Sequence, residues 1–278
     1  MEQDIKLPGG TIHLSVAGQG PATIVLLPGL GEPCPILEMK PLASALQDHL
    51  RVISLEPYGY GGSDPAPTPR TIENICEELH QVMKALGIEK YTLAAHSISG
   101  IYALYHLHQY AEEVSTFVGL DISVPCQFTH PMAKEEIGLM TQMRQEQAQA
   151  ASEEVLSEIR EGAIQQLTSL TSYPFSPEEL KRYGEMALKS VKDPTVLDEI
   201  RHTEENASKA LSLKIPDELP AVMLIAKENT KRLSEWEPWH RAICGSNTTL
   251  EILDSDHYVH LQQTQQVAEA IRSLLLGR

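Results

Sequence analysis

Basic residues are scarce in this sequence. Its 278 residues include 22 lysines and arginines against 38 aspartates and glutamates, and the formal net charge is −16. Binding to nucleic acid or to an anionic membrane surface depends on clustered positive charge, so the sequence predicts neither kind of partner. The excess of carboxylates is typical of a protein that its charge keeps in solution.

Cysteines and long apolar runs are also few. The four cysteines are widely separated and form no Cys-x-x-Cys pair, so we expect neither a disulfide framework nor a metal site. No apolar stretch approaches the ~20 residues of a membrane span. Residues 1–10 lack the basic start and the apolar run of a signal peptide. A cytoplasmic location is therefore expected, and nothing in the sequence points to a particular oligomeric state.

What the sequence does contain is an alternation of strand-like and helix-like segments. Short apolar or alternating runs predict strands at residues 11–17, 22–27, 50–55, 91–95, 116–120, 221–226 and 249–253. Helical periodicity separates them at residues 35–47, 71–87, 97–110, 231–243 and 260–276. Strands that alternate with helices form βαβ units, so we predict an α/β fold with a mostly parallel sheet sandwiched by helices.

The alternation stops in the middle of the chain. From about residue 131 to residue 213 only helical patterns occur, at about 133–148, 152–170, 177–190 and 194–212. The strand pattern then resumes. We therefore predict a core made of residues 1–125 and 215–278, with an all-helical cap of residues 126–214 inserted between two core strands.

A serine stands where one predicted strand turns directly into a helix. Such a turn crowds the positions two before and two after its apical residue, so both must be small. Here the apex is Ser97 and these neighbours are Ala95 and Ser99. The turn predicts a nucleophilic Ser97 hydroxyl at the carboxyl edge of the sheet, with the amide of Ile98 facing a developing oxyanion. The alternative interpretation is an ordinary serine cap of the helix.

Together, these motifs resemble the α/β-hydrolase fold family over nearly the whole chain. Residues 27–31 (LPGLG) are similar to the family's His-Gly-x-Gly oxyanion loop, with Pro28 in place of the histidine. Residues 56–64 resemble its Asp-x-x-Gly-x-Gly-x-Ser loop, with Glu56 in place of the aspartate. The resemblance implies that the backbone N–H of Leu30 is the second oxyanion donor, beside that of Ile98. It also implies that the helical block is a cap.

The base is predicted to be His257, which follows the last predicted strand and precedes the last helix, where the family has its catalytic histidine. His260, three residues on, is the second choice. His96 adjoins the serine in sequence, but neighbours on such a turn point apart, so we interpret it as a packing residue or a support for the oxyanion loop.

Two acids satisfy the family's chain order of serine, acid, histidine. Asp121 ends the strand before the helical block, and Glu228 follows the strand after it. Most members of the family take the acid from the later strand, at a position that here corresponds to Asn229, and an amide cannot stabilise the charge of an imidazolium. Relatives such as haloalkane dehalogenases use the earlier strand with a similar acid-x-x-x-Pro spacing. We favour Asp121, with Glu228 as the alternative.

A serine, a histidine, an acid and two backbone donors suit acyl transfer. We therefore expect hydrolysis of a small-molecule carboxylic ester through an acyl-enzyme on Ser97, with no cofactor. A serine in place of a nucleophilic aspartate argues against dehalogenase and epoxide-hydrolase chemistry. The alternatives are a carbon–carbon bond hydrolase, and a lyase or cofactor-free oxygenase that uses the same Ser-His site. A non-catalytic binding protein is a further alternative, which the departures from the family motifs leave open.

Apolar positions of the helical block have two interpretations. They either line a substrate pocket or pack the helices together, and they include Ile137, Leu139, Met140 and Met143. Trp236 and Trp239, which follow the block, are interpreted as packing residues.

Overall fold

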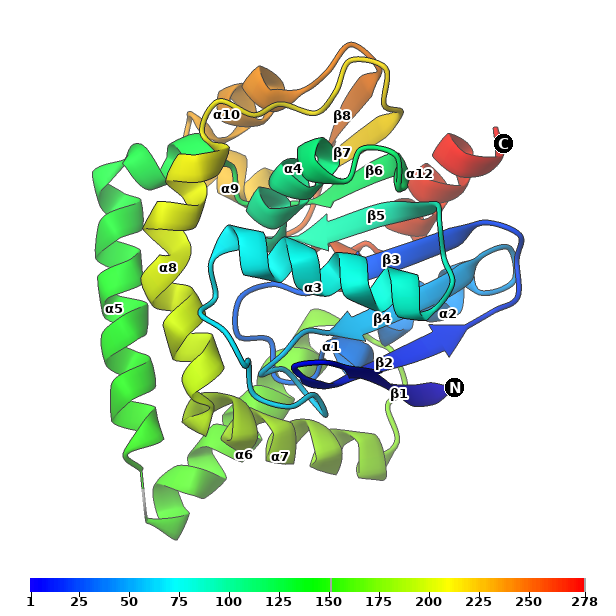
Figure 1. Cartoon of the computed structure of the whole chain (residues 1–278). Coiled ribbons are helices and arrows are strands. Elements are labelled where there is room, and N and C mark those ends of the chain that lie inside the picture. The colour runs from blue at the N-terminus through cyan, green and yellow to red at the C-terminus, as the bar shows by residue number, and fades with distance from the viewer. Residues whose placement is uncertain (151, 278) are drawn as a thin grey trace.

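The computed structural model describes residues 1–150 and 152–277 (Figure 1). One eight-stranded sheet has the order β1-β2-β4-β3-β5-β6-β7-β8. Its strands are β1 (Glu2–Leu7), β2 (Gly10–Ala17), β3 (Thr23–Leu27), β4 (Arg51–Glu56), β5 (Tyr91–His96), β6 (Val114–Leu120), β7 (Ala221–Ala226) and β8 (Thr248–Leu253). β1 pairs with β2 and β2 with β4 in the antiparallel sense, and all other pairs are parallel. The predicted α/β fold with a mostly parallel sheet is confirmed.

Helices cover both faces of the sheet. One face packs against α3 (Ile72–Ala85) and α4 (Ser99–Gln109), and the other against α2 (Lys40–Leu46) and α12 (Thr264–Leu276). Along β3, Val25 and Leu27 belong to the first core, whereas Ile24 and Leu26 belong to the second. Successive side chains of a strand point to opposite faces, so a continuous apolar run is what a strand buried on both faces requires.

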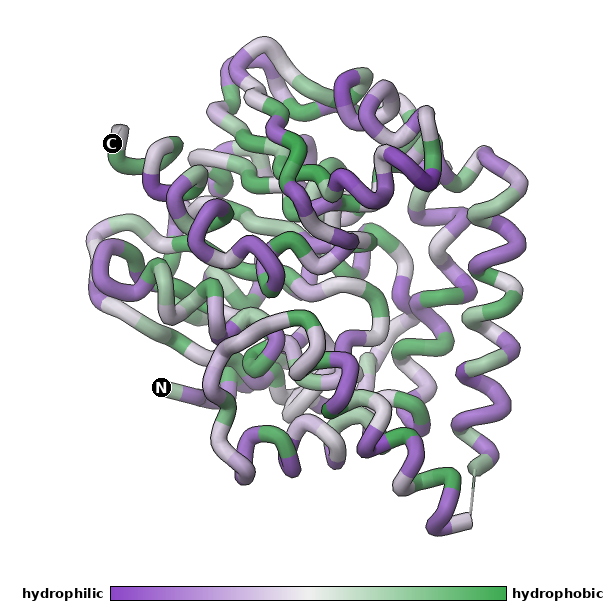
Figure 2. The backbone as a smooth tube through the Cα atoms, turned by 180° about the vertical axis from the view of Figure 1, so that it is seen from behind, coloured by the Kyte–Doolittle hydropathy of each residue, from purple (hydrophilic) through white to green (hydrophobic). Residues whose placement is uncertain are grey.

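Four helices lie between β6 and β7. They are α5 (Pro131–Ala148), α6 (Glu153–Leu170), α7 (Pro177–Lys192) and α8 (Pro194–Ala210), close to the predicted ranges. The starts of the last two follow from local chemistry. Ser176 and Glu179 form a reciprocal capping box at α7, and Asp193 accepts a hydrogen bond from the amide of Thr195 at α8. Figure 2 shows hydrophobic and hydrophilic residues alternating along these helices, as one-sided packing requires.

The helical insertion stands over the edge of the sheet where the parallel strands end. In Figure 1 the arrowheads of β5 and β6 point toward α8 and α5. Groups at the carboxyl ends of these strands therefore face the insertion, which is where ligands of open α/β sheets bind. No helix among residues 1–150 and 152–277 is long and apolar enough to cross a membrane.

Three predicted helices are interrupted. Residues 35–47 form α1 (Pro35–Glu38) and α2, because Pro41 has no N–H with which to continue the first helix. Residues 231–243 are divided between α9 (Lys227–Arg232) and α10 (Trp236–Ile243), which has Pro238 in its first turn, where proline is tolerated. Residues 260–276 are divided between α11 (Val259–Gln262) and α12. A 3₁₀ turn, η1 (Pro125–Thr129), was not predicted.

Candidate active site

Ser97 occupies a strained turn between β5 and α4. Its φ of +53° lies in the left-handed region, which residues other than glycine rarely adopt. The turn is held by its own backbone, because the carbonyl of Ser97 accepts hydrogen bonds from the amides of Ser123 at 2.7 Å and Gly100 at 3.0 Å. Strain that the surroundings hold in place in this way is typical of functional sites.

The neighbours of this turn are small because space is short. A Cβ atom on Gly100 would lie 2.3 Å from Cβ of Ile122, so only glycine fits there. The hydroxyl of Ser99 donates to the carbonyl of Pro28 at 2.5 Å, which joins the turn to the loop after β3. Ala95 is fully buried. The predicted crowding is therefore present, and the serine in place of the second family glycine forms a useful contact.

His257 connects the serine to a carboxylate. Its Nε2 lies 2.9 Å from Oγ of Ser97, and its Nδ1 donates to Oδ2 of Asp121 at 2.7 Å. A proton on Nδ1 leaves the lone pair of Nε2 facing the serine hydroxyl, the tautomer that a general base needs. His257 lies in the loop between β8 and α11, so residues from three distant segments meet at the carboxyl edge of the sheet.

Asp121 is fully buried and completely hydrogen-bonded. Besides His257, it accepts from the amide of Ala226 at 2.8 Å, the indole Nε1 of Trp236 at 2.9 Å and Nδ2 of Asn229 at 2.5 Å. Burial raises the pKa of Asp121, but the hydrogen bond and charge of His257, with the other donors, lower it by more, so the pKa lies below its ordinary value. The carboxylate therefore remains charged beside the imidazole.

The two residues considered at the end of β7 have different positions. Asn229, which corresponds to the family's usual acid, donates to Asp121 and lies 3.5 Å from Nδ1 of His257. Glu228 is more than half exposed and forms an ion pair with Lys231. Within the described part of the chain, Glu228 has no contact with His257. The geometry thus places Asp121 beside the histidine and Asn229 in support of that carboxylate.

Two backbone amides near Ser97 have no partner. Among residues 1–150 and 152–277, neither the N–H of Leu30 nor that of Ile98 donates a hydrogen bond. Both residues line the same cavity of about 520 Å³ as Ser97 and His257. The Leu30 loop is held by Gly31, which has a φ of +69° and donates to the hydroxyl of Tyr60 at 3.1 Å. Unpartnered amides beside a nucleophile can accept a negative oxygen.

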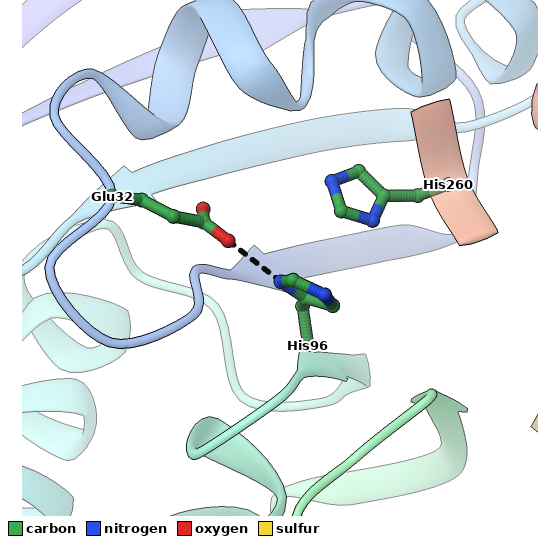
Figure 3. Close-up of side chains that lie close together, drawn as sticks. All are labelled: Glu32, His96 and His260. Atoms are coloured by element: carbon green, nitrogen blue, oxygen red, sulfur yellow. Dashed lines mark hydrogen bonds and ion pairs between the residues drawn. The ribbon is translucent and has the colours of Figure 1, made fainter. Parts of the chain in front are cut away.

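A buried polar cluster lies behind this site. Nδ1 of His96 lies 2.6 Å from Oε1 of Glu32 (Figure 3). Its Nε2 donates to the carbonyl of His257 at 3.2 Å, so His96 also supports the loop of the base. A Cβ atom on Gly29 would lie 2.6 Å from Oε1 of Glu32, which explains the glycine of this loop. His96 is thus a supporting residue, one of the two roles considered for it.

The same cluster contains the residues that could hold a metal ion. Glu32, His96 and His260 each offer one ligand atom, and these atoms lie within 4.8 Å of one another. A tetrahedral ion with bonds of about 2.0–2.1 Å keeps its ligands more than about 3 Å apart, so the 2.6 Å contact is a hydrogen bond and would have to open to admit an ion. Burial and the nearby His96 hold the pKa of His260 well below its ordinary value, so this second-choice base stays neutral away from Ser97.

The helical insertion contributes apolar side chains to the cavity at Ser97. All four apolar positions that the sequence singled out line it, namely Ile137, Leu139, Met140 and Met143. A second cavity of about 600 Å³ extends under α5, α6 and α7. The two cavities share Leu30, Glu32, Met140, Met143 and Tyr258, so their walls are continuous.

Sequence reasoning missed two contributions to the site. Trp236 was expected only to pack, yet its indole donates to Asp121. Glu32 was not singled out, although it is a charged residue directly after a glycine-rich loop. That position is the one signal that could have indicated a role for it.

Known proteins with the same architecture were found by sequence and by structure. A family model described as the alpha/beta hydrolase fold matches residues 22–275. The uncharacterized protein YbdG of Bacillus subtilis (strain 168) is 24% identical, over 95% of this chain and 82% of that protein. A protein from Nostoc sp. PCC 7120, described as an α/β hydrolase, has a TM-score of 0.78 at 17% identity, over 99% of this chain and 97% of its own.

Enzymes are also among the structural neighbours. A thermophilic esterase from Thermogutta terrifontis has a TM-score of 0.70 at 21% identity, over 99% of this chain and 98% of its own. Epoxide hydrolases share the architecture as well. At such identities the likeness shows the fold alone, so the reaction has to be argued from the site.

Proposed function

This chain belongs to the α/β-hydrolase fold family, and on that premise we propose that it is a serine hydrolase of small-molecule carboxylic esters. The observation that carries the proposal is the continuous series of hydrogen bonds from Ser97 through His257 to Asp121. The unpartnered amides of Leu30 and Ile98 beside the serine add the oxyanion site.

The proposed reaction has two halves. Nε2 of His257 takes the proton of Ser97 as Oγ attacks the ester carbonyl, and the negative oxygen is held by the amides of Leu30 and Ile98. The tetrahedral intermediate collapses when the C–O bond to the alcohol breaks and His257 returns the proton to the alcohol. Water then attacks the acyl-enzyme with His257 again as base, which releases the acid and restores Ser97. Asp121 stabilises the imidazolium in both halves.

The choice of nucleophile separates this proposal from epoxide hydrolysis. A nucleophilic carboxylate has to reach the substrate, but Asp121 is fully buried and its four hydrogen-bond donors occupy both oxygens. Ser97 instead lines the cavity. The hydroxyl is therefore the group placed to attack, and its chemistry is acyl transfer.

The helical insertion supports a second part of the proposal. We assign residues 1–125 and 215–278 to the core and residues 126–214 to a cap that roofs the acyl pocket. Support comes from the insertion's side chains on the wall of the Ser97 cavity and from its place over the carboxyl ends of β5 and β6. The proposed chemistry needs no metal or organic cofactor.

Hydrolysis of p-nitrophenyl acetate, butyrate and octanoate by the wild type and by Ser97→Ala tests the function. We expect turnover by the wild type and its loss in the variant, with the chain-length preference reporting the size of the pocket. Turnover that persists in Ser97→Ala would remove Ser97 as nucleophile. A wild type inactive on all three esters would contradict the esterase proposal and favour carbon–carbon bond hydrolysis or lyase chemistry.

The acid is tested by Asp121→Asn. Asparagine tolerates the left-handed φ of +43° at this position, so the fold should be retained. Loss of the charge beside His257 should lower kcat by about 10⁴-fold, the effect of the same change in a serine protease triad. The matched control is Glu228→Gln, for which we expect less than about a twofold change because Glu228 is at the surface. The opposite result for the two variants would move the acid to Glu228.

A further inference from the structure

Arg144 is a cation without an anion. It lies on α5 and lines the second cavity, which shares five lining residues with the cavity at Ser97. Its Nη2 donates to the carbonyl of Gly31 at 3.0 Å, and its Nη1 to the hydroxyl of Ser190 at 3.3 Å. Both acceptors are neutral. Within residues 1–150 and 152–277, Arg144 forms no ion pair.

Within the described residues, no carboxylate on the wall of this cavity forms an ion pair with Arg144. Glu32 is hydrogen-bonded to His96, and Glu38 accepts from the hydroxyl of Tyr183 at 2.8 Å. Burial and the proximity of Glu32 raise the pKa of Glu38 well above its ordinary value, which favours the neutral form of this carboxyl group. Glu158, also on the wall, is exposed to solvent on α6. The positive charge of Arg144 is therefore free to act on a ligand.

A desolvated guanidinium without a counter-ion is unfavourable for the free protein. Arg144 is partly buried and forms no ion pair within the described residues, and burial lowers the pKa of its guanidinium. Two of the five N–H groups of an arginine are used here, so three remain for a ligand. The flat fork of an arginine matches the two oxygens of a carboxylate.

The other residues that line this cavity indicate the chemistry of the rest of the ligand. The lining of the second cavity is mainly apolar, with side chains that include Met140, Met143, Ile159, Ala163, Leu167 and Leu170. We propose that Arg144 binds a carboxylate of the substrate, and that the enzyme therefore acts on esters whose acyl chain ends in a carboxylate. This inference rests on the proposed serine hydrolase function and names its substrate class.

Ligand binding at Arg144 should also affect the proposed oxyanion site. The carbonyl that Arg144 holds belongs to Gly31, the residue after Leu30, whose amide is the proposed oxyanion donor. A carboxylate that fixes the guanidinium fixes this loop as well. The preference for an anionic ester should therefore appear in kcat as well as in KM.

A matched pair of esters tests the proposal. Mono-(4-nitrophenyl) glutarate carries a terminal carboxylate, and p-nitrophenyl valerate has the same acyl length without it. We define the preference ratio as kcat/KM for the glutarate ester divided by kcat/KM for the valerate ester. The wild type should have a ratio above one. Arg144→Met should lower the ratio by about 10- to 100-fold, the range expected for hydrogen bonds to a charged group.

The control variant is Lys134→Met. Lys134 is an exposed cation on the same helix, paired with Glu204, and it lines neither cavity within the described chain. The Lys134→Met substitution removes the same unit of charge as Arg144→Met but outside the described cavity walls, so its preference ratio should stay within about twofold of the wild-type ratio. An equal fall of the preference ratio in both variants would show a long-range effect of net charge and would contradict the proposed carboxylate site at Arg144.

Binding provides a readout that is independent of turnover. Calorimetric titration of Ser97→Ala with glutarate should show binding that is lost in the Ser97→Ala/Arg144→Met double variant, whereas valerate should bind both proteins alike. Arg144→Met should melt no lower than the wild type, because a partly buried charge without a counter-ion has been replaced by an apolar side chain. A lower Tm together with an unchanged preference ratio would make Arg144 a packing residue and contradict the proposal.

The two proposals fail in different ways. Ester turnover that survives Ser97→Ala contradicts the serine mechanism, whatever Arg144 does. Ser97-dependent turnover with equal preference ratios in the wild type and Arg144→Met contradicts only the carboxylate site.

Discussion

The two halves of the helical insertion differ in how they are held to the core. In α8, eight of 17 residues are buried, whereas α5 and α6 bury one each of their 18 residues, Ala133 and Leu167. The exposed large apolar side chains of the described chain are concentrated in α5 and α6, as Met132, Leu139, Met140, Met143 and Val155. One half is therefore fixed to the core, and the other presents apolar surface over the cavities.

Buried charges and amides fix the α8 half. Arg70, in the loop before α3, pairs with Glu78 at 2.5 Å and lies 3.5 Å from Glu199 of α8, which also accepts from the hydroxyl of Tyr102. Because these groups are buried, each requires its partner. We infer from this comparison that α8 sets the position of the insertion on the core. Substitutions in α5 and α6 should therefore alter the cavities with little effect on the stability of the fold.

The largest expected effect on the free energy of unfolding comes from removing the cation of the buried ion pairs. Arg70→Met leaves Glu78 and Glu199 buried without their cation, so the free energy of unfolding should fall by about 3–5 kcal/mol. Urea denaturation followed by circular dichroism measures it. The matched variant is Arg160→Met in α6, where the partner Glu153 is exposed, and its unfolding curve should overlay that of the wild type. Equal losses in both variants would refute the difference between the halves.

A smaller effect is expected from a single amide. Oδ1 of Asn206 accepts from the amide of Ile72 at 2.8 Å, and its Nδ2 donates to the carbonyl of Arg70 at 2.9 Å. Asn206→Ala leaves two backbone groups without partners and should cost about 1–3 kcal/mol of unfolding free energy. Gln142→Ala in α5, whose amide bonds only to exposed Glu146, should change it by less than about 0.5 kcal/mol. If Gln142→Ala lowered the free energy of unfolding as much as Asn206→Ala, the proposed difference between α5 and α8 would be contradicted.

A substitution at Met143 is expected to change substrate specificity while having the smallest effect on stability. Met143 is more than half exposed and lines both cavities. Met143→Gln should change the unfolding free energy by less than about 0.5 kcal/mol. It should lower kcat/KM for p-nitrophenyl octanoate several-fold relative to that for the acetate, because a long chain needs the apolar wall. A stability loss without a change in chain-length preference would place Met143 in packing rather than in the pocket.

The fold could be predicted because its signals are local. Apolar runs gave the strands, 3.6-residue periodicity gave the helices, and Ser176 and Asp193 marked two helix starts. The division of residues 35–47 was also signalled locally, because Pro41 lies in the interior of that range, where proline interrupts a helix; the prediction of one helix was wrong there.

The site could be predicted only in part. Small neighbours identify the turn at Ser97 and chain order identifies His257, but the sequence left Asp121 and Glu228 open. Which carboxylate lies beside His257 depends on side-chain directions at the ends of two adjacent strands, β6 and β7. The donors that hold Asp121, and the missing counter-ion of Arg144, depend on contacts between residues more than a hundred positions apart.

The order of the site along the chain has a consequence for biosynthesis. Ser97 and Asp121 directly follow the adjacent strands β5 and β6, before the insertion, while His257 follows the last strand. A chain emerges from the ribosome N-terminus first, at about 5–20 residues per second, and a domain folds as a unit. A ribosome-bound chain that has emerged as far as α8 contains the proposed nucleophile and acid, but neither the proposed base nor the last two strands of the sheet. If the proposed roles hold, Ser97 therefore cannot act as a nucleophile until the last segment of the chain has emerged.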